Sequence, residues 1–337
     1  MKSKKNTISV AMAVCNGENF IAEQLYSIIN QTMPVDEIII CDDSKNEKTF
    51  NVLKNIIEKN QQLIKYYHNT DVLGVSQNFA KAISLTTKDF IMLADQDDLW
   101  LPNKVADLYN TLSKHCSRAN SKYCGAFCNS KLVDKNLSPF KPSVSHLQLR
   151  DFNVSEILQT QDNKQQQFNL FLKRVPIAGH NMIFTKESKS IILPFPKLKE
   201  CHDSWIGYNI VALGGWHFCN EELTLFRQHE RNVSQANRHN QLYEALKSLR
   251  TNTFHWNMQL FEALIRRLSP HVEQKLIDEL QDRSEHSQQR AKMTKISIVH
   301  RFFIIIKELK NKRYFNYSRG WKSAFQDLVL NIFVKHK

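Results

Sequence analysis

The sequence predicts an α/β fold, in which a mostly parallel sheet is flanked by helices and followed by a C-terminal helical extension. Three observations predict this fold. Within residues 7–94, short strand-like runs alternate with segments whose apolar residues recur at helical spacing. Acidic residues follow two of these runs, at the position where parallel sheets bind ligands. From residue 240 onward, the apolar pattern is helical.

The first four predicted strands are short, and the apolar run over residues 90–94 has the length and composition of a buried strand. They cover residues 7–14, 37–41, 64–68 and 89–94. Helices are predicted between them over residues 18–31, 47–60 and 75–87. Strands that alternate with helices in this way indicate βαβ units and a parallel sheet with covered faces.

The second half of the chain is less regular. Residues 134–167 are polar and poorly periodic, which predicts a loop-rich connection or a mobile flap. The later predicted elements are strands over 182–184 and 222–227, a helix from about Cys201 to Leu213, and a helical segment over 240–285 that breaks at Ser269-Pro270. We expect two domains, formed by residues 1–235 and 236–337.

Composition indicates an ordinary globular protein, with 42% hydrophobic and 23% charged residues among 337. The chain has eight Gly and neither the G-x-G-x-x-G nor the G-x-x-x-x-G-K-[ST] pattern, which argues against dinucleotide and P-loop sites. Its seven Cys form no C-x-x-C pair, so we expect no zinc ribbon and a reducing cytosol. No stretch approaches 18 apolar residues, so no membrane span is predicted.

The net charge of +13 is concentrated near the C-terminus, because residues 287–337 contain 12 Lys or Arg and two acids. Apolar residues recur there on one helical face, first at Ile298, Phe302, Ile305 and Leu309 and again from Trp321. Attachment to a membrane surface and packing of these faces on the rest of the chain both fit this pattern. Nucleic-acid binding is disfavoured, because no recognised binding motif accompanies the charge.

Two acidic clusters carry the functional prediction. Asp42-Asp43 and the run Asp95-Gln96-Asp97-Asp98 each follow an apolar strand, so both fall at the edge where parallel sheets bind ligands. Carboxylates buried there without partners would be very costly. Mg²⁺ and Mn²⁺ take oxygen ligands and commonly reach substrate phosphates through one or two carboxylates. The clusters therefore predict a site for a divalent metal and a phosphate-bearing ligand.

Several short motifs follow one another in a characteristic order. They are residues 10–17, Gln31-Thr32, Asp42-Asp43-Ser44, Gly74 with Asn78, Asp95 to Trp100, Pro102, Lys104, His202-Asp203 and Arg227-Gln228-His229 with Asn232. On these residues, the stretch 7–235 resembles the family 2 glycosyltransferases of the GT-A fold, and most of all their bacterial rhamnosyltransferase-type branch. The resemblance implies an inverting, metal-dependent glycosyltransferase whose catalytic domain is residues 1–235.

The resemblance also implies a role for each matching residue. It assigns Asn16, Glu18, Asp43, Gly74, Asn78, Asp95 and Arg227 to donor binding, Asp97 and His229 to the metal, and Asp203 to the catalytic base. The implied cofactor is Mg²⁺ or Mn²⁺, which stabilises the departing diphosphate as a Lewis acid. The base would take the proton of the acceptor hydroxyl from a distance of roughly 2.6–3.2 Å.

Structural roles stay open for several of these residues. Asp203 also suits the N-cap of a helix over 204–213, and Asp98 suits a cap of the helix that follows Pro102. The remaining open readings are Asp42 and Asp43 as turn residues, His229 as a hydrogen-bonded loop histidine, and His180, Trp100 and Trp205 as packed or hydrogen-bonded residues.

The resemblance implies a nucleoside diphosphate sugar as donor, with rhamnose on a thymidine carrier as the first expectation. The implied acceptor is a glycan or a lipid-linked sugar in cell-surface polysaccharide assembly. The expected location is the cytoplasm, with peripheral contact to the inner face of the plasma membrane through the C-terminal tail, and no nucleic-acid partner is expected. The alternative function is a catalytically silent GT-A scaffold or a partner-dependent binding protein.

Overall fold

The computed structural model describes residues 6–119, 121–139, 154–229 and 242–329. The chain divides into two compact units. The first is formed by Met1–Gln167 and Pro176–His229, and the second by Phe168–Val175 and Glu230–Lys337. The predicted domain boundary at 235/236 lies outside the described residues. The short segment Phe168–Val175 belongs to the second unit although it lies far upstream of that boundary.

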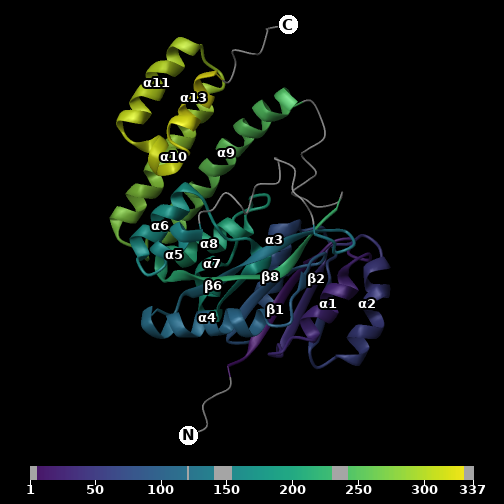
Figure 1. Cartoon of the computed structure of the whole chain (residues 1–337). Coiled ribbons are helices and arrows are strands. Elements are labelled where there is room, and N and C mark those ends of the chain that lie inside the picture. The colour runs from purple at the N-terminus through teal and green to yellow at the C-terminus, as the bar shows by residue number, and fades with distance from the viewer. Residues whose placement is uncertain (1–5, 120, 140–153, 230–241, 330–337) are drawn as a thin grey trace. The chain divides into compact units, whose positions relative to one another are not determined.

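The first unit is built on one eight-stranded sheet with the strand order β3-β2-β1-β4-β7-β6-β8-β5 (Figure 1). Its strands are β1 (Ile8–Val14), β2 (Glu37–Asp42), β3 (Ile64–His68), β4 (Phe90–Asp95), β5 (Leu99–Trp100), β6 (Cys124–Asp134), β7 (Met182–Thr185) and β8 (Gly215–Gln228). The pairs β1–β2, β1–β4, β2–β3 and β6–β8 are parallel, whereas β7 and β5 run antiparallel to their partners. The predicted mostly parallel sheet is confirmed.

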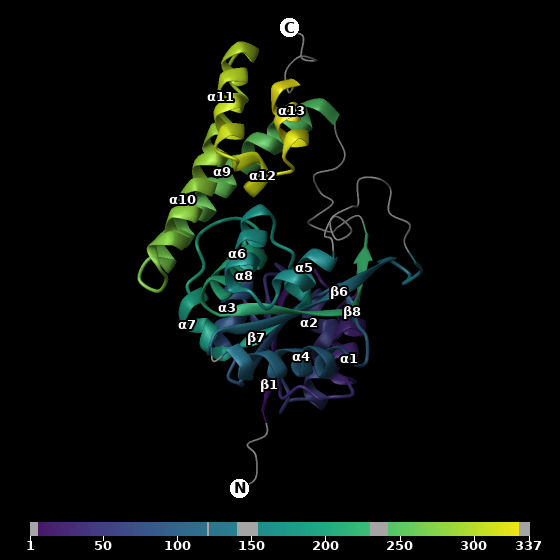
Figure 2. The ribbon, with the colours of Figure 1, turned by 60° about the vertical axis from the view of Figure 1, so that its left-hand side comes forward.

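Helices cover both faces of this sheet. They are α1 (Ile21–Ile29), α2 (Lys48–Lys59), α3 (Val75–Leu85), α4 (Lys104–Ala119), α5 (Val154–Thr160), α7 (Lys189–Ile192) and α8 (His202–Leu213), with the 3-10 helices η1 (Gly179–Asn181) and η2 (Lys186–Ser188). The helix α6 (Lys164–Lys173) begins in the first unit and continues into the second. Figure 2 shows α1 and α4 on one side of the sheet and α5 and α8 on the other. On the first side, Leu25, Leu53 and Leu108 pack with residues of β1, β2 and β6 in one apolar core. This core fixes the edge at which the parallel strands end.

The first unit differs from the prediction at two places. The segment 134–167, expected to be a loop, carries α5 and the start of α6, while residues 140–153 lie outside the described chain. α5 has seven residues, of which Ile157 is buried, so its sequence shows little periodicity. β8 begins at Gly215 rather than at residue 222, because polar residues 220–222 lie at a shift in its pairing with β6.

The second unit contains the C-terminal helices. They are α9 (Leu242–Leu268), α10 (Gln274–Met293), α11 (Ile298–Lys310), α12 (Arg313–Tyr317) and α13 (Trp321–Val329). The predicted break at Ser269-Pro270 is confirmed, because α9 ends one residue earlier. A small apolar core in this unit consists of Met293, Ile305, Tyr314 and Ala324. Across the described residues, we find no helix with the length and apolar content that a membrane crossing needs.

Candidate active site

Both acidic clusters lie at one edge of the sheet. In the parallel register, Asp42 of β2 pairs with Val14 of β1, and Asp95 of β4 pairs with the adjacent Ala13. The carboxyl ends of these three strands therefore meet, as the sequence predicts. This is the edge at which parallel α/β sheets bind ligands.

Asp43 and Asn78 tie the loops at this edge together. Asp43 accepts hydrogen bonds from the amide nitrogen of Asn69 at 2.6 Å and from the backbone N–H of Gly74 at 2.8 Å. Asn78 donates to the carbonyls of Val14, the last residue of β1, and Cys41, the residue before the last in β2, and accepts from Asn69. Both side chains are buried. They therefore hold the loops at this edge of the sheet, and contact of either residue with a donor stays a prediction.

Gly74 and Asn16 hold backbone conformations that suit a ligand loop. Gly74, the residue before α3, has a φ of +77°, and a Cβ there would meet nothing within 4 Å. Conformation rather than close approach therefore accounts for glycine at this position. Asn16 also has a positive φ of 52° and is exposed after β1, next to the half-buried Glu18. Their predicted donor contacts are untested by the geometry.

Gln96 joins the acidic run to the loop after β1, a contact that sequence reasoning missed. Its side chain accepts from the N–H of Cys15 at 2.8 Å and donates to the carbonyl of the same residue at 3.0 Å. A Cβ at Gly17 would come within 2.8 Å of the Gln96 oxygen, so glycine is needed for the close approach. The two loops are thereby held together.

The acidic run and two histidines form the metal-competent part of the site. Asp97 Oδ2 lies 2.9 Å from His229 Nε2. His180 Nδ1 lies 3.3 Å from Asp95 Oδ2 and 3.7 Å from Asp98 Oδ2, and the ligand atoms of these three residues lie within 4.8 Å of one another. Carboxylate oxygens and imidazole nitrogens are both ligands of Mn²⁺-type ions. The residues present therefore fit a divalent cation.

Asp98 is buried at this site, and its predicted helix-capping role is wrong. Its Oδ1 accepts the backbone N–H of Arg227, and its Oδ2 faces His180 without a hydrogen-bond partner in the described structure. Burial, together with the charges of Asp95 and Asp97, raises the pKa of Asp98 to about 7 against the opposing effects of His180 and Lys104. A buried oxygen with no donor suits a position near a cation.

His180 is the principal residue that the sequence reading undervalued. Burial alone would lower its pKa, but the carboxylates of Asp98 and Asp95 raise it above the ordinary value. The buried ammonium of Lys104 fixes the backbone of this histidine, because it donates hydrogen bonds to the His180 carbonyl and to the Thr224 hydroxyl at 2.6 Å each. His180 therefore joins the acidic run to η1.

Arg227 fixes the backbone of the metal-competent group. Its Nε donates to the carbonyl of Asp97 at 2.9 Å, and its other guanidinium nitrogens donate to the Lys135 carbonyl and the Glu23 carboxylate. The side chain is buried, and its guanidinium lies 4.5 Å from the Phe20 ring centre. These contacts position Asp97, and contact of Arg227 with the donor stays a prediction.

Asp203 stands in the first turn of α8, which begins at His202 after the cap residue Cys201, so the expected N-cap role of Asp203 is wrong. Its Oδ1 lies 2.7 Å from His202 Nε2, and the side chain is 38% exposed. Burial would raise the pKa of this carboxyl, but the charge and hydrogen bond of His202, with the N–H of Gly179, hold the pKa below its ordinary value. An ionised, accessible carboxylate is what a general base requires.

The short helix η1 connects the two carboxylate groups. Its first residue, Gly179, lies against Asp203, while the next, His180, contacts Asp95. The contacts of η1 with Asp203 and Asp95 join residues far apart in the chain. In the sequence, only the triplet Gly179-His180-Asn181 could have indicated this part of the site. Trp100 and Trp205, by contrast, are buried as the packing reading predicts.

If Asp203 is the base that the resemblance implies, replacing Gly179 by alanine should lower the rate of the implied sugar transfer about 100-fold, because displacement of a catalytic group by about 1 Å has an effect of that size. The added Cβ would collide with the Asp203 carboxylate and crowd His202. Steady-state kinetics measure the loss, and nucleotide binding measured by calorimetry should be unchanged. Glycine-to-alanine replacement at Gly215, whose φ of +143° makes alanine strained there, is the control for general destabilisation: it should lower the melting temperature without the loss of activity expected at Gly179.

The fold and the site together define a GT-A glycosyltransferase: a mixed sheet with an acid-rich, metal-competent edge and a separate exposed carboxylate. Residues 9–188 match the family described as Glycosyl transferase family 2. The chain therefore belongs to glycosyltransferase family 2, whose members transfer a sugar from a nucleotide sugar. The family match ends before Asp203, Arg227 and His229, so their roles depend on geometry.

The chain is similar to several characterised proteins. It is 26% identical over 238 residues to the dTDP-rhamnosyl transferase RfbG of Shigella flexneri, covering 67% of this chain and 74% of that protein. It is 28% identical over 142 residues to the Escherichia coli protein WfgD, described as a UDP-Glc:alpha-D-GlcNAc-diphosphoundecaprenol beta-1,3-glucosyltransferase. That match covers 42% of this chain and about half (54%) of WfgD.

Two solved structures share the fold. The S. aureus protein TarS (residues 1–349), in complex with UDP-GlcNAc, has a TM-score of 0.53 at 15% identity, covering 95% of this chain and 92% of that one. The mannosyltransferase PcManGT of Pyrobaculum calidifontis, in complex with GDP-Man and Mn²⁺, has a TM-score of 0.54 at 15% identity, covering 99% and 89%. At these identities the likeness bears on the fold.

Proposed function

We propose that this enzyme is an inverting, metal-dependent glycosyltransferase that moves a sugar from a nucleoside diphosphate carrier to a glycan or lipid-linked acceptor in cell-surface polysaccharide synthesis. One observation supports the proposal most strongly: the sheet edge has two distinct carboxylate groups. Asp95 and Asp97 lie beside histidines, and Asp203 stands apart with an exposed side chain and a lowered pKa.

The donor side would be held by the acidic run. Asp97 with His229, and Asp95 with His180, would supply oxygen and nitrogen ligands to a divalent ion, and the unpartnered oxygen of Asp98 lies close enough to His180 and Asp95 to be a further ligand. When bound, Mg²⁺ or Mn²⁺ acts as a Lewis acid that stabilises the departing diphosphate. The Mn²⁺ in the PcManGT structure supports this cofactor class. Asn16, Glu18, Asp43 and Gly74 lie on the loops that would face the nucleotide.

The acceptor side would be served by Asp203. Its carboxylate would take the proton of the acceptor hydroxyl while that oxygen attacks the anomeric carbon, whose bond to the diphosphate breaks. A base opposite the leaving group gives a single displacement with inversion. The lowered pKa keeps Asp203 ionised at neutral pH, so it is ready to accept the proton.

The relatives narrow the donor and acceptor classes. The name of RfbG supports rhamnose on a thymidine diphosphate carrier as the first donor to test. The name of WfgD supports a diphosphoundecaprenol-linked sugar as the acceptor class. Both fit an enzyme that works in the cytoplasm, where activated sugars are made, against the inner face of the plasma membrane.

A thermal-shift screen tests the function. The protein is heated with dTDP, UDP and GDP and with their sugars, each with and without Mn²⁺. A cognate ligand at about 100 times its Kd should stabilise the protein by about 2.7 kcal/mol. A shift that requires both the nucleotide sugar and the metal supports the proposal. If none of these ligands shifts the melting temperature, the proposal is wrong and a silent scaffold is favoured.

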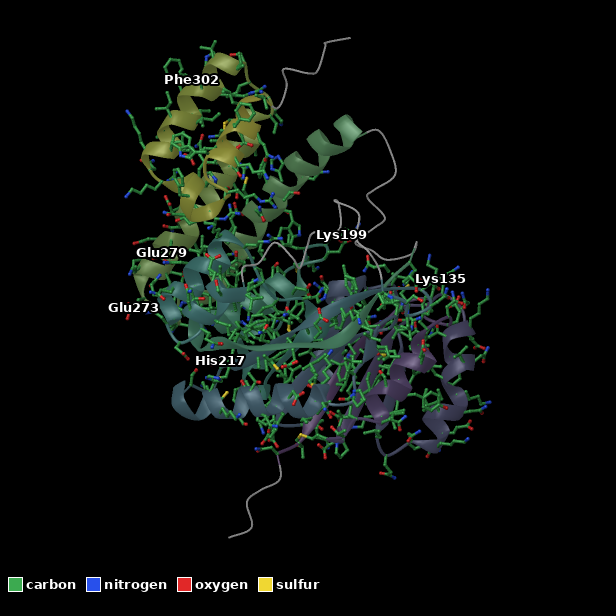
Figure 3. The ribbon with its side chains drawn as sticks, viewed as in Figure 1. Lys135, Lys199, His217, Glu273, Glu279 and Phe302 are labelled. Carbon is green, nitrogen blue, oxygen red and sulfur yellow. The ribbon has the colours of Figure 1, made fainter. Side chains whose placement is uncertain are left out.

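Membrane contact is proposed for the helices α11 and α13. Their exposed large apolar side chains are Ile298, Val299, Phe302, Phe303, Trp321 and Phe325. Figure 3 labels Phe302, on the outer side of α11. The exposed cations around them are Lys295, Lys307, Lys310, Lys312, Arg319 and Lys322, while Glu308 and Asp327 are buried. An apolar face with surrounding cations suits an anionic lipid surface.

Replacing Phe303 and Phe325 together by serine is expected to weaken binding to phosphatidylglycerol vesicles at least about 100-fold, because each buried Phe contributes roughly 1.5–3 kcal/mol. The two side chains are 66% and 65% exposed, so the fold should survive. Vesicle sedimentation measures the effect. Val52→Ser, at an exposed apolar residue of α2, is the control and should bind like the wild type. Equal sedimentation of all three proteins would contradict membrane contact.

A further inference from the structure

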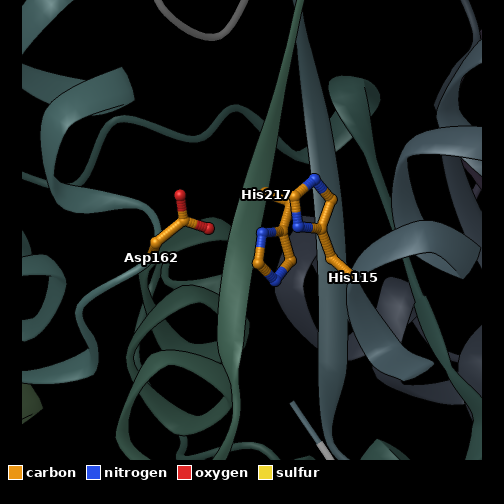
Figure 4. A group of neighbouring side chains, drawn as sticks. All are labelled: His115, Asp162 and His217. Carbon is orange, nitrogen blue, oxygen red and sulfur yellow. The ribbon is translucent and has the colours of Figure 1, made fainter. Parts of the chain in front are cut away.

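A second group of metal-ligating side chains lies outside the active site. It consists of His115 near the end of α4, Asp162 in the turn between α5 and α6, and His217 near the start of β8 (Figure 4). One ligand atom from each residue lies within 4.8 Å of the others. The two imidazole rings are stacked, with centroids 3.8 Å apart and planes inclined by 10°. Three elements that are distant in the sequence thus converge on one point.

The backbone on either side of this group is held in place. The side-chain oxygen of Gln161 accepts the N–H of Phe218 at 3.3 Å. Gln167 bonds both the N–H and the carbonyl of Trp216, at 2.8 and 2.5 Å. Gln161 of the α5–α6 turn and Gln167 of α6 therefore tie this part of the chain to β8 immediately after and before His217. Asp162 lies between these two residues in the chain, and Figure 4 shows one of its carboxylate oxygens turned toward the His217 ring.

One ring nitrogen of His217 lacks a hydrogen-bond partner within the described residues. The residue is 7% exposed, and its Nδ1 is buried without a hydrogen-bond partner in the described part of the chain. A buried polar atom left unpaired is costly, which calls for an occupant that the ring nitrogen can bind.

We propose that His115, Asp162 and His217 form a second metal site, which binds a divalent transition ion of the zinc class and joins α4, β8 and the α5–α6 turn. Two imidazoles and one carboxylate are a ligand set that zinc accepts, with water in the fourth position. Hard ions such as Mg²⁺ prefer oxygen ligands and suit the acidic edge instead.

Binding requires only local adjustment. Bonds of about 2.0–2.1 Å to a tetrahedral ion separate the ligand atoms by roughly 3.3 Å, less than the present upper limit of 4.8 Å. The stacked rings must tilt so that one nitrogen of each faces the ion. His115 is half-buried and Asp162 is exposed, so both can move toward His217, which is fixed in the core.

The test counts bound ions. Chelator-treated protein is titrated with Zn²⁺ in excess Mg²⁺, and with Co²⁺, whose visible absorption reports a four-coordinate site. We expect His115→Ala and Asp162→Asn each to bind one equivalent fewer than the wild type and to lose the rise in melting temperature that Zn²⁺ produces. Asp162 is exposed, so Asp162→Asn keeps the test valid if His115→Ala fails to fold. His271→Ala, at an exposed histidine between α9 and α10, is the matched control and should bind as the wild type does.

Equal zinc stoichiometry in wild type and both site variants would overturn the proposal and leave the stacked pair as ordinary packing. Loss of the same equivalent in Asp97→Asn, with retention in the two site variants, would also overturn it, because the ion would then belong to the active site. The second site is independent of the proposed transferase function, so neither result depends on the donor or the acceptor.

Discussion

Replacing Asp97 by asparagine is expected to lower sugar transfer about 1,000-fold, which corresponds to about 4 kcal/mol of lost transition-state stabilisation. Asp97 Oδ2 faces His229, and the asparagine amide would remove one negative ligand from the metal. Without the ion, the departing diphosphate loses its Lewis acid. Release of nucleoside diphosphate from the donor found in the screen measures the rate, and a Mn²⁺ titration should require more metal for half-maximal activity.

The control for this replacement is Asp278→Asn, at an exposed carboxylate of α10 in the second unit. This variant makes the same chemical change without touching the acidic edge, so its rate should equal that of the wild type. If Asp97→Asn transfers sugar at the wild-type rate, the assignment of the metal to the acidic run is wrong.

Replacing Asp203 by asparagine is expected to lower transfer by about 10²–10⁴-fold, the range for loss of a general base. An amide cannot accept the acceptor proton, yet it has nearly the shape of the carboxylate and should leave the donor side intact. Nucleotide affinity in the presence of Mn²⁺ should therefore stay within about twofold of the wild type. If nucleotide binding collapses together with activity, Asp203 is structural.

The pH dependence of the wild type gives a second test of this residue. Asp203 acts when deprotonated, and its pKa lies below the ordinary value because His202 and the Gly179 N–H stabilise the charged form against burial. Burial raises the pKa of Asp98 in the acidic run to about 7, so the profile is recorded at saturating Mn²⁺, where metal binding no longer limits the rate. Under that condition the rate should stay level from neutral pH downward and fall only below about pH 4, the region of an ordinary carboxyl pKa. His202→Ala removes the stabilising charge, so the fall should move to higher pH. An acid limb near neutral pH that persists at saturating Mn²⁺ would contradict this role.

The ligand-binding edge of the sheet is predictable from the sequence, because the residues that indicate it are close together in the chain. An apolar run followed at once by Asp95 to Asp98 indicates a strand end with acids, and the parallel register brings Asp42 to the same edge. The alternation of strands and helices over residues 7–94 is likewise a local pattern. These features depend on residues close together in the chain.

The parts of the site that depend on contacts between residues distant in the chain are not predictable from the sequence. His180 reaches Asp95 and Asp98 only because η1 passes behind β4, and nothing near residue 180 in the sequence reports that contact. In the sequence, Asp98 has only the features of a capping residue. Its partner in the structure, the backbone N–H of Arg227 in β8, is too distant in the chain to be predicted. The partners of Arg227 itself, at Glu23 and Lys135, come from two other segments. Local periodicity carries no information about such long-range packing.

The most direct measurement of the two-part site is calorimetric binding of the cognate nucleoside diphosphate, with Mn²⁺, to the Asp97→Asn and Asp203→Asn variants. The geometry predicts that Asp203→Asn binds like the wild type while Asp97→Asn loses the metal-dependent part of the affinity, because only Asp97 lies in the metal-competent group. If both variants bind equally, whether tightly or not at all, the division into a metal-linked donor side and a separate base is wrong.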